Sequence, residues 1–360
     1  MQTELMMLPA PDEMYDALVR KDTSYDGIFF TAVTSTGIFC RPSCPARKPL
    51  RENVEFYASP KAAMAAGYRA CRRCKPLEPA GTSPEWLKPL LDEMETHPER
   101  RWTDEDLRAR DLEPGRVRRW FKTQYGMTFH AYQRGMRLGK ALGQLRNGAP
   151  VTRTAFDAGY DSLSGFNDAF RQLAGLSPNA SRDAEAIMVT RVLTPLGPMI
   201  AGATATALCL FEFMDQDRLE RQFRAISRRL PGPLAPGRNA ILEQVEGELE
   251  RYFNGDLRAF TIPLHTPGSD FQQAVWRVLR EIPYGETRSY AEQARALGRP
   301  EAVRAVARAN GDNRIAIIIP CHRVIGADGS LTGYGGGLWR KRWLLDLEQG
   351  RRTLSVRKTA

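Results

Sequence analysis

Helical periodicity is clearest in the middle of the chain, where apolar residues recur at helical spacing across residues 103–125. Thr103 stands before the first apolar stretch and Asp106 follows three residues later, a variant of the capping box that predicts a helix start. "EPG" at 113–115 predicts a turn, and Pro114 suits the first turn of the next helix. The pattern therefore predicts a helix-turn-helix.

A second unit of this kind is predicted over residues 151–178, after a long helix over 131–148 that ends at Gly148. The apolar positions expected to face the core are Val117, Trp120 and Phe121 in the first unit and Ala155, Ala158, Tyr160, Phe166, Phe170 and Leu173 in the second. The basic residues among them are left for the surface. Residues from about 85 to 182 are thus expected to be all-α.

The segment from about residue 188 alternates short apolar runs with helical stretches, which predicts an α/β fold. Within it, Ile315–Ile319 is predicted to form a buried strand that Pro320 stops, so that Cys321 and His322 follow directly at its end. On the N-terminal side, the Pro- and Gly-rich "KPLEPAGTSPEW" (75–86) predicts a linker.

The 360-residue chain has a formal net charge of +10, which favours a polyanionic partner, with nucleic acid first. An indifferent basic surface is the alternative. No apolar run approaches the roughly 20 residues that a membrane span needs, and the N-terminus does not resemble a secretory signal. We therefore expect a cytoplasmic protein without membrane contact. Six cysteines are too few for a secreted disulfide scaffold, so paired cysteines favour metal binding or catalysis.

Four of the cysteines form two closely spaced pairs, Cys40 with Cys44 and Cys71 with Cys74. Four thiolates suit tetrahedral zinc, so the spacing predicts one Zn²⁺ in a closed site. A purely structural zinc is the alternative. Nine basic residues against two acids lie between Arg41 and Lys75, however. Because a thiolate is the reactive form of cysteine and cations attract phosphate, a sulfur of this site can also be a nucleophile.

The strings "GIFCRPSCPAR", "LRENVEFYAS" and "AAGYRACRRC" resemble the N-terminal module of the Ada adaptive-response DNA repair proteins. The resemblance implies that Cys40 takes a methyl group from a methylphosphotriester in DNA. It also implies that Cys40, Cys44, Cys71 and Cys74 bind the zinc. The residues of this module expected to contact DNA are Arg41, Arg47, Arg51, Arg72 and Arg73.

The two helical units joined by a long helix resemble the AraC-type DNA-binding domain. Arg116, Arg118, Arg119 and Lys122 are the basic residues of the first unit left for DNA, and the resemblance implies that the three arginines contact it. The second recognition helix is poor in basic residues and offers Arg171, so we expect the first unit to supply most contacts. An all-α interaction domain is the alternative.

The string "NRIAIIIPCHRVIGADGSLTGYGGGLWRKRWLLDLE" resembles the O6-alkylguanine-DNA alkyltransferases, whose active-site motif is PCHR. The resemblance implies that Cys321 is the methyl acceptor and that His322 acts as base through a bridging water. Glu348 would orient His322, as in other cysteines activated by a base with a third group behind it. Asn313 would organise the turn beside the active site. The loop shaping the guanine pocket is expected at Tyr334, Gly335, Gly336 and Gly337.

Residues 282–313 resemble the helix-turn-helix of the same family, with its turn at Gly298–Pro300. The resemblance implies that Arg304 fills the base stack where the guanine leaves it and that Tyr290 helps to rotate the nucleotide. Base flipping is required because a pocket cannot reach the O6 methyl group of a stacked base. Cys209, in an apolar run within 188–265, is expected to be a core residue.

Together these features predict a multidomain α+β protein. The expected domains are a zinc-binding α/β module (1–78), an all-α AraC-type double helix-turn-helix (85–182), an alkyltransferase α/β subdomain (188–265) and a helical, winged-helix-like catalytic subdomain (267–350).

The expected activity is that of a methylated-DNA–[protein]-cysteine S-methyltransferase that turns over once per site. Cys321 would take methyl groups from O6-methylguanine and O4-methylthymine. Methylation of Cys40 would convert the protein into an activator of repair genes. The expected partners are alkylated and promoter double-stranded DNA and RNA polymerase, and the protein is expected to be a monomer. The alternatives are an AraC-type regulator with zinc but no repair, and a repair enzyme without promoter-specific activation.

Overall fold

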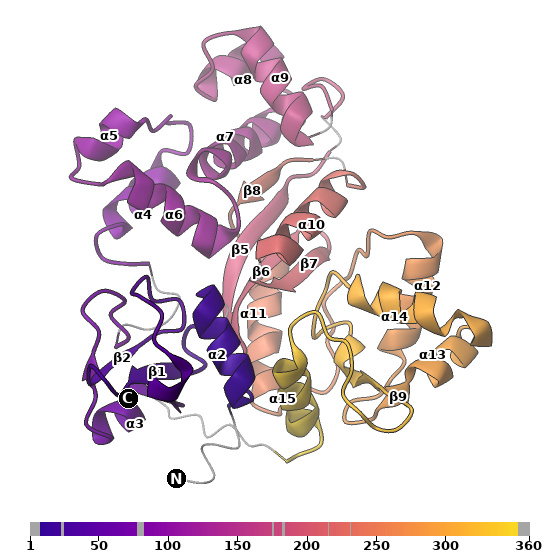
Figure 1. Ribbon diagram of the computed structural model, residues 1–360. Helices are drawn as coiled ribbons and strands as arrows, with labels where there is room; N and C mark the ends of the chain where they lie inside the picture. Colours follow the sequence, from indigo (N-terminus) through magenta and orange to yellow (C-terminus); the bar gives the residue numbers. More distant parts are fainter. Residues whose placement is uncertain are drawn as a thin grey trace.

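A computed structural model describes residues 8–22, 25–77, 83–174, 176–181, 184–214, 216–230 and 232–351. Residues 78 and 182, where two segment boundaries were expected, and residues 78–82 of the expected linker lie outside the described residues. A four-stranded sheet, β5 to β8, occupies the centre of Figure 1, and the remaining elements surround it. No described helix is long and apolar enough to cross a membrane.

The N-terminal elements form a small α/β unit, as the sequence predicted. Its strand order is β3-β1-β2-β4, with β1 antiparallel to β2 and β3, and β2 parallel to β4. Gly37 allows the tight turn between β1 and β2 because its φ is +65°. The elements are α2 (Pro11–Arg20), β1 (Phe30–Val33), β2 (Ile38–Cys40), η2 (Arg51–Asn53), β3 (Val54–Tyr57), α3 (Pro60–Ala65) and β4 (Arg69–Ala70).

The helical middle has the two expected helix-turn-helix units. Thr103 and Asp106 form a reciprocal capping box at the start of α5, and Pro114 is the first residue of α6. The long helix α7 is followed by Gly148, which has a φ of +87°. The helices are α4 (Lys88–Thr96), α5 (Asp104–Arg108), α6 (Pro114–Tyr125), α7 (Phe129–Arg146), α8 (Val151–Asp157) and α9 (Leu163–Ala174).

Each helical unit has its own apolar core. Val117 and Phe121 are fully buried in the first and Phe166 and Phe170 in the second, which confirms the helical periodicity. Four further expected core positions are also buried or partly buried: Trp120, Ala155, Ala158 and Tyr160. The side chain of Leu173, the last expected position, lies outside the described part of the chain.

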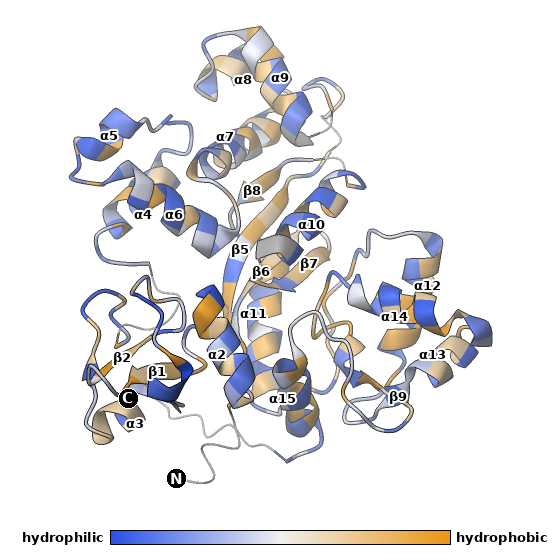
Figure 2. Cartoon of the chain, in the orientation of Figure 1, coloured by the Kyte–Doolittle hydropathy of each residue, from blue (hydrophilic) through white to orange (hydrophobic). Residues whose placement is uncertain are grey.

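The central sheet has the order β7-β6-β5-β8, with β8 parallel to β5 and the other pairs antiparallel. All residues of β6 and β7 are buried, and Figure 2 shows hydrophobic residues along the strands. Cys209 is a core residue as expected, and its Sγ donates to Gly202 O at 3.1 Å. The elements are β5 (Ile187–Thr194), β6 (Gly197–Ala203), β7 (Leu208–Phe213), α10 (Gln216–Ser227), β8 (Leu234–Pro236) and α11 (Ala240–Phe253).

The C-terminal elements form a helical unit with one short parallel strand pair, β9 with β10. Gly298 makes the expected turn between α13 and α14 with a φ of +75°. The elements are α12 (Asp270–Arg280), β9 (Arg288–Ser289), α13 (Tyr290–Ala296), η3 (Pro300–Ala302), α14 (Val303–Gly311), η4 (Cys321–Arg323), β10 (Val324–Ile325) and α15 (Leu338–Glu348).

The strand predicted at Ile315–Ile319 is wrong. These residues form a compact turn in which Ile318 N donates to Ala316 O at 2.8 Å and Ile319 N donates to Ile315 O at 2.9 Å. Ile315 makes an isolated bridge to Phe211 of β7. An unbroken apolar run indicates burial but does not distinguish a buried turn from a buried strand. Ile317 has a φ of +70°, which is strained for a β-branched residue.

The segments pack closely on the central sheet. Helix α7 lies so near β8 that a Cβ at Gly135 would be 2.6 Å from Leu234 O. Lys122 of α6 pairs with Glu220 of α10. The largest apolar core joins residues of α2 and the N-terminal unit to β6, α11 and α15, and Figure 1 shows α2 beside these helices. The helical middle and the N-terminal unit therefore both pack against the central sheet and its helices.

Candidate metal centre and candidate active site

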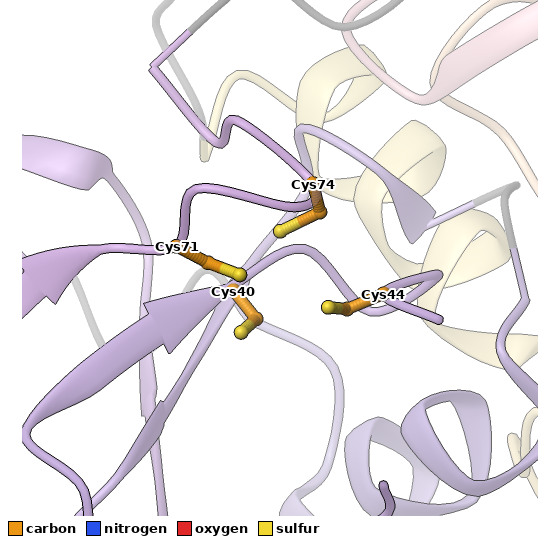
Figure 3. Close-up of side chains that lie close together, drawn as sticks. All are labelled: Cys40, Cys44, Cys71 and Cys74. Atoms are coloured by element: carbon orange, nitrogen blue, oxygen red, sulfur yellow. The ribbon is translucent and has the colours of Figure 1, made fainter. Parts of the chain in front are cut away.

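The four paired cysteines meet at one point. Cys40 ends β2, Cys44 lies in the following loop, and Cys71 and Cys74 follow β4. Their sulfur atoms all lie within 4.8 Å of one another, and Figure 3 shows the four side chains converging. The parallel pairing of β2 with β4 brings the two sequence pairs together, because both strands deliver their C-terminal ends to the same edge.

The donor set fits zinc. Four sulfurs at this separation can surround one tetrahedral ion. Without a cation among the sulfurs, hydrogen bonds to Cys44 and Cys74, together with burial, raise the pKa of the Cys40 thiol. A divalent cation among them supplies the charge that lets all four be thiolates. Arg41 N also donates to Cys74 Sγ at 3.4 Å, which favours the thiolate of that ligand.

A cavity of about 740 Å³ opens beside this cluster. One wall is the face of β1 and β2 that carries Thr31, Ile38 and Cys40, since cross-strand partners share a face. The basic residues on its lining are Lys21, Arg47, Lys48, Arg69, Arg72 and Arg73. An anionic molecule of matching size can therefore approach Cys40 through a positively charged opening.

The expected DNA-contacting arginines of the N-terminal unit differ in their surroundings. Arg47, Arg72 and Arg73 are on the cavity lining. Arg41 donates to Lys75 O at 3.0 Å, which ties the two cysteine loops together. Arg51 lies over the rings of two neighbours, Tyr15 of α2 and Phe56 of β3, so it also holds α2 against the sheet.

Cys321 begins η4 directly after the Ile315–Ile319 turn and is buried. The side chain of Asn313 fixes this turn, because its Nδ2 donates to Ile319 O at 2.8 Å and to Cys321 Sγ at 3.1 Å. Its Oδ1 accepts from Ile315 N at 3.0 Å. Asn313 thus contacts both the strained turn and the sulfur.

His322 is fully buried beside Cys321 in the chain. Its Nε2 lies 2.9 Å from Glu348 Oε1 on α15. Its Nδ1 is buried without a hydrogen bond to any atom of the described residues, so it can accept a proton. Glu348 also accepts hydrogen bonds from Arg323 Nε at 2.8 Å and from Tyr252 OH at 2.7 Å. Tyr252 shares Oε1 with the imidazole, whereas Arg323 Nε binds the other oxygen, Oε2, so both carboxylate oxygens have partners.

The three ionisable groups at this site, Cys321, His322 and Glu348, all have shifted pKa values. Burial raises the pKa of the Cys321 thiol, and the hydrogen bond from Asn313 opposes this rise. Burial lowers the pKa of His322, while the neighbouring Glu348 opposes the fall. Burial favours a higher pKa for Glu348, but the charge of His322 and the hydrogen bonds from His322 and Arg323 lower it overall. At neutral pH the site therefore holds a neutral imidazole between a thiol and a carboxylate.

The loop from Gly333 to Gly337 covers this site. The rings of Tyr334 and His322 are 6.5 Å apart, edge to face. A Cβ at Gly336 would lie 2.5 Å from the ring of Phe213, and one at Gly335 would lie 2.3 Å from Arg218 Cζ. Only glycine fits at these two positions without displacing a neighbour.

The other expected DNA contacts of the C-terminal unit lie on its helices. Arg304 is exposed on α14. Tyr290 begins α13, and its OH donates to Thr332 O at 3.1 Å, so it touches the loop that leads to Tyr334.

Three of the expected arginines of the helical middle have partners within the protein. Arg116 lies 4.0 Å over the ring of Trp86. Arg118 pairs with Asp104, and Arg119 lies 3.5 Å from Glu113. Arg171 is exposed on α9. The acidic neighbours reduce the positive potential of α6.

Several residues at the Cys321 site were missed from the sequence. Glu212 is fully buried at the end of β7 and binds Arg218 Nε at 2.6 Å, and Arg218 donates to Asn313 O at 3.1 Å. The acid within the apolar run "LCLFEF" was a signal for Glu212. Arg323 was visible as the last residue of PCHR. Nothing in the sequence pattern singled out Tyr252.

Three family models match this chain. "Metal binding domain of Ada" matches residues 13–77, "Helix-turn-helix domain" matches 108–184, and "6-O-methylguanine DNA methyltransferase, DNA binding domain" matches 270–350. These ranges contain the four-cysteine cluster, helices α6 to α9 of the helical middle, and Cys321 with His322 and Glu348.

Curated relatives cover both the whole chain and its C-terminal part. The Bifunctional transcriptional activator/DNA repair enzyme Ada of Escherichia coli (strain K12) is 38% identical over 94% of this chain and 96% of its own. The Methylated-DNA–protein-cysteine methyltransferase of Mycobacterium leprae is 46% identical over 43% of this chain and 88% of its own. Among solved structures, Mycobacterium tuberculosis OGT in complex with DNA is 43% identical over 47% of this chain and 96% of its own, with a TM-score of 0.40.

Proposed function

This chain belongs to the Ada family, and we propose that Cys321 and Cys40 are its two methyl acceptors. Members of this family repair alkylated DNA by transferring methyl groups to their own cysteines, and this chain does so and also activates transcription as an AraC-type protein. Cys321 would take the methyl group from O6-methylguanine and from O4-methylthymine, and Cys40 would take it from a DNA methylphosphotriester. The partner of both reactions is DNA.

The contact of Asn313 with both Cys321 Sγ and the preceding turn is the observation that best supports the assignment of Cys321. It fixes the sulfur beside a buried imidazole that Glu348 orients. In the reaction His322 takes the thiol proton through a water, and the thiolate attacks the methyl carbon. The S–CH₃ bond forms as the O6–CH₃ bond breaks, and the electron pair stays on guanine. The proton held by His322 can then neutralise the base.

The transfer should occur once per protein molecule, because the product is a thioether and no group at the site is suited to cleave it. Burial of the sulfur would protect it from competing reactions until a flipped base reaches it beside Tyr334. Tyr290 and Arg304 would help the base to leave the stack, since extrusion is required for access.

The chain holds one Zn²⁺, and we assign Cys40, Cys44, Cys71 and Cys74 as its ligands. When bound, the metal keeps all four sulfurs deprotonated at neutral pH. The thiolate of Cys40 then attacks the methyl carbon of a phosphotriester, the O–CH₃ bond breaks, and the electron pair remains on the phosphate oxygen. Cys40, Cys44 and Cys71 all line the basic cavity, which supports a methyl acceptor among them, and the resemblance of the GIFCRPSCPAR string to the Ada module assigns that role to Cys40.

The transcriptional switch would follow from charge. Four thiolates with Zn²⁺ carry two net negative charges, and methylation of Cys40 leaves one. Repulsion of DNA phosphates falls, and at low dielectric one charge amounts to kilocalories. Methylated Cys40 would thus make the N-terminal unit and the helical middle a tighter, sequence-specific binder that recruits RNA polymerase.

We further propose that the protein is a cytoplasmic monomer with domains at 1–78, 85–182, 188–265 and 267–350. Its substrate and its promoter both belong to the chromosome, which supports the location. The three separate family matches support the division.

The test uses DNA with labelled methyl groups at guanine O6 or at phosphate, followed by peptide mapping. Label from O6 should appear on Cys321, and label from phosphate on Cys40. No label on Cys321 would favour a regulator without repair. Label on Cys321 alone would remove the switch and favour a repair enzyme without promoter-specific activation.

The switch itself is tested by measuring promoter DNA affinity across salt concentrations, with and without prior methylation of Cys40. We expect the methylated protein to bind more tightly. Equal affinities with equal salt dependence would contradict the switch.

A further inference from the structure

The N-terminal unit takes part in the core of the C-terminal unit. Tyr25 and Phe29 lie in the same apolar cluster as Phe213 of β7 and Trp339 of α15. Tyr25 makes a direct contact with the other unit, with its ring 5.8 Å from that of Trp339. The unit around the zinc ligands is therefore packed against the helix that follows the guanine-pocket loop.

Arg340 is the centre of this contact. It is almost completely buried, and its guanidinium lies 5.2 Å from the ring of Tyr25, 4.6 Å from Phe213 and 4.7 Å from Trp339. Three rings around one cation offset part of the cost of burying its charge.

The polar atoms of Arg340 hold the pocket loop. Its Nη1 donates to Gly336 O at 2.7 Å, and its Nε donates to Leu196 O at 2.8 Å in the turn between β5 and β6. Gly336 belongs to the loop that covers Cys321. The position of this loop thus depends on where the guanidinium is held.

Tyr25 also reaches the loop directly. Its OH donates to Glu13 Oε1 at 2.8 Å, and a Cβ at Gly337 would lie 3.4 Å from Glu13 Oε1 and 3.6 Å from Tyr25 OH. Phe213 and Tyr25 both pack against the guanidinium of Arg340, and the ring of Phe213 lies 6.2 Å from the ring of Tyr334. Tyr25 and Glu13 therefore limit the space into which the loop could move.

The residue next to Tyr25 contacts the loop that carries the zinc ligand Cys44. Asp26, next to Tyr25, accepts from Ser43 N at 3.2 Å and from Ser43 Oγ at 2.6 Å. Ser43 precedes the zinc ligand Cys44. Two successive residues thus contact the surroundings of both acceptor cysteines.

We propose that Tyr25 is a positioning residue for methyl transfer to Cys321, acting through Arg340 on the pocket loop. The inference rests on the proposed role of Cys321 as methyl acceptor. The zinc-binding unit then supplies a positioning residue to the second acceptor site.

The test measures single-turnover transfer to Cys321 in the full-length, zinc-loaded chain. The variants are Tyr25→Leu, which fills the core but removes the aromatic face over Arg340, and Tyr25→Phe, which keeps it. The matched control is Tyr57→Leu. Tyr57 belongs to the same unit but packs against Tyr68 in a separate cluster. Substrates are duplex DNA with O6-methylguanine and the free base O6-benzylguanine.

We expect Tyr25→Leu to lower the maximal rate constant about tenfold with both substrates, as loosened positioning does. The half-saturating concentration of DNA should stay within about twofold of that of the unaltered chain, since a positioning defect acts on the bound complex. Tyr25→Phe should restore most of the rate, and Tyr57→Leu should match the unaltered protein. Zinc content and the thermal unfolding midpoint, measured in parallel, show that each variant is folded.

An unchanged rate in Tyr25→Leu overturns the inference, as does a loss confined to the half-saturating DNA concentration. An equal loss in Tyr57→Leu also overturns it, because the effect would then be general destabilisation. If Tyr25→Leu fails to fold, Tyr25→Met, whose flexible side chain can fill the same space without an aromatic face, must slow transfer while Tyr25→Phe keeps most of the rate. Failure of the unaltered chain to methylate Cys321 would instead refute the proposed function.

Discussion

Glu348 Oε1 lies 2.9 Å from His322 Nε2, although the two residues are 26 positions apart in the chain. The carboxylate holds the imidazole through Nε2, which leaves Nδ1 without a hydrogen bond to the described residues and available for the Cys321 proton in the proposed reaction. We predict that Glu348→Gln lowers the single-turnover rate of transfer to Cys321 by about 100-fold, within the range that general bases contribute. Rapid-quench transfer from O6-methylguanine DNA measures this.

The matched control is Glu246→Gln, because Glu246 pairs with Arg238 on the surface of α11. This variant should transfer at the unaltered rate. If the Glu348 variant kept its rate while remaining folded, His322 would not need its carboxylate and the proposed base would be wrong.

The pH dependence of transfer follows from the two shifted groups. Burial lowers the pKa of His322, so its neutral form should persist at about pH 6.5 and the rate should fall only in more acidic solution. Burial raises the pKa of Cys321, so without the base the thiolate becomes scarce at neutral pH. We therefore predict that His322→Asn transfers slowly at about pH 7 and gains about tenfold per pH unit up to about pH 9.

Single-turnover rates between about pH 5.5 and about pH 9 measure both profiles. The unaltered chain should show a nearly level rate above about pH 7. Parallel profiles for the two proteins would mean that His322 does not take the proton.

Measuring the zinc content of variants tests whether the four clustered cysteines, and not the buried Cys209, bind the metal. We predict one zinc per chain in the unaltered protein and in Cys209→Ala, and less than about a tenth of that in Cys71→Ser after dialysis. Three thiolates and a hydroxyl form a much poorer zinc site than four thiolates. Elemental analysis by mass spectrometry checks this. Full zinc content in Cys71→Ser would place the metal elsewhere.

The arginines of α6 should dominate DNA binding by the helical middle. We predict that replacing Arg116, Arg118 and Arg119 with alanine weakens binding to duplex DNA. The slope of log affinity against log salt should fall by about one unit for each phosphate that the variant no longer neutralises. Filter binding between about 50 and 300 mM salt measures it. Arg171→Ala on α9 should change the slope by about one unit at most, and a larger effect from Arg171 would reverse the assignment.

Asp104 offers a test in the opposite direction. It pairs with Arg118 in the free protein, so Asp104→Asn should release this arginine and remove a negative charge from the DNA-facing side. We expect tighter DNA binding and a steeper salt dependence, measured by the same assay. Weaker binding would mean that the pair orients Arg118 for DNA.

Local signals in the sequence were sufficient for the helical middle. Thr103, Asp106 and Pro114 mark helix ends by chemistry that acts within one turn, so the elements formed where the sequence predicted them. The zinc ligands could be found for a related reason, since close spacing within each pair leaves the fold only one long-range contact to make, the pairing of β2 with β4.

Sequence patterns did not predict the structure where tertiary packing determines the backbone conformation. Ile317 adopts a left-handed conformation that its side chain disfavours, and the surrounding hydrogen bonds from Asn313 compensate for it. No propensity scale predicts such a turn. The contact of Tyr25 with Arg340 joins residues from opposite ends of the chain. This contact is stabilised by a cation packed between aromatic rings, and such an interaction gives no hydrophobic periodicity in the sequence of either segment.

The position of Glu348 at the end of α15 also sets an order of synthesis. Cys321 and His322 leave the ribosome before the carboxylate that orients them. A nascent or trimmed chain that ends before residue 348 can carry the zinc cysteines and the helical middle, but its second sulfur has no oriented base beside it. Proteolysis at α15 would therefore disarm the proposed repair of guanine while leaving the zinc ligands intact.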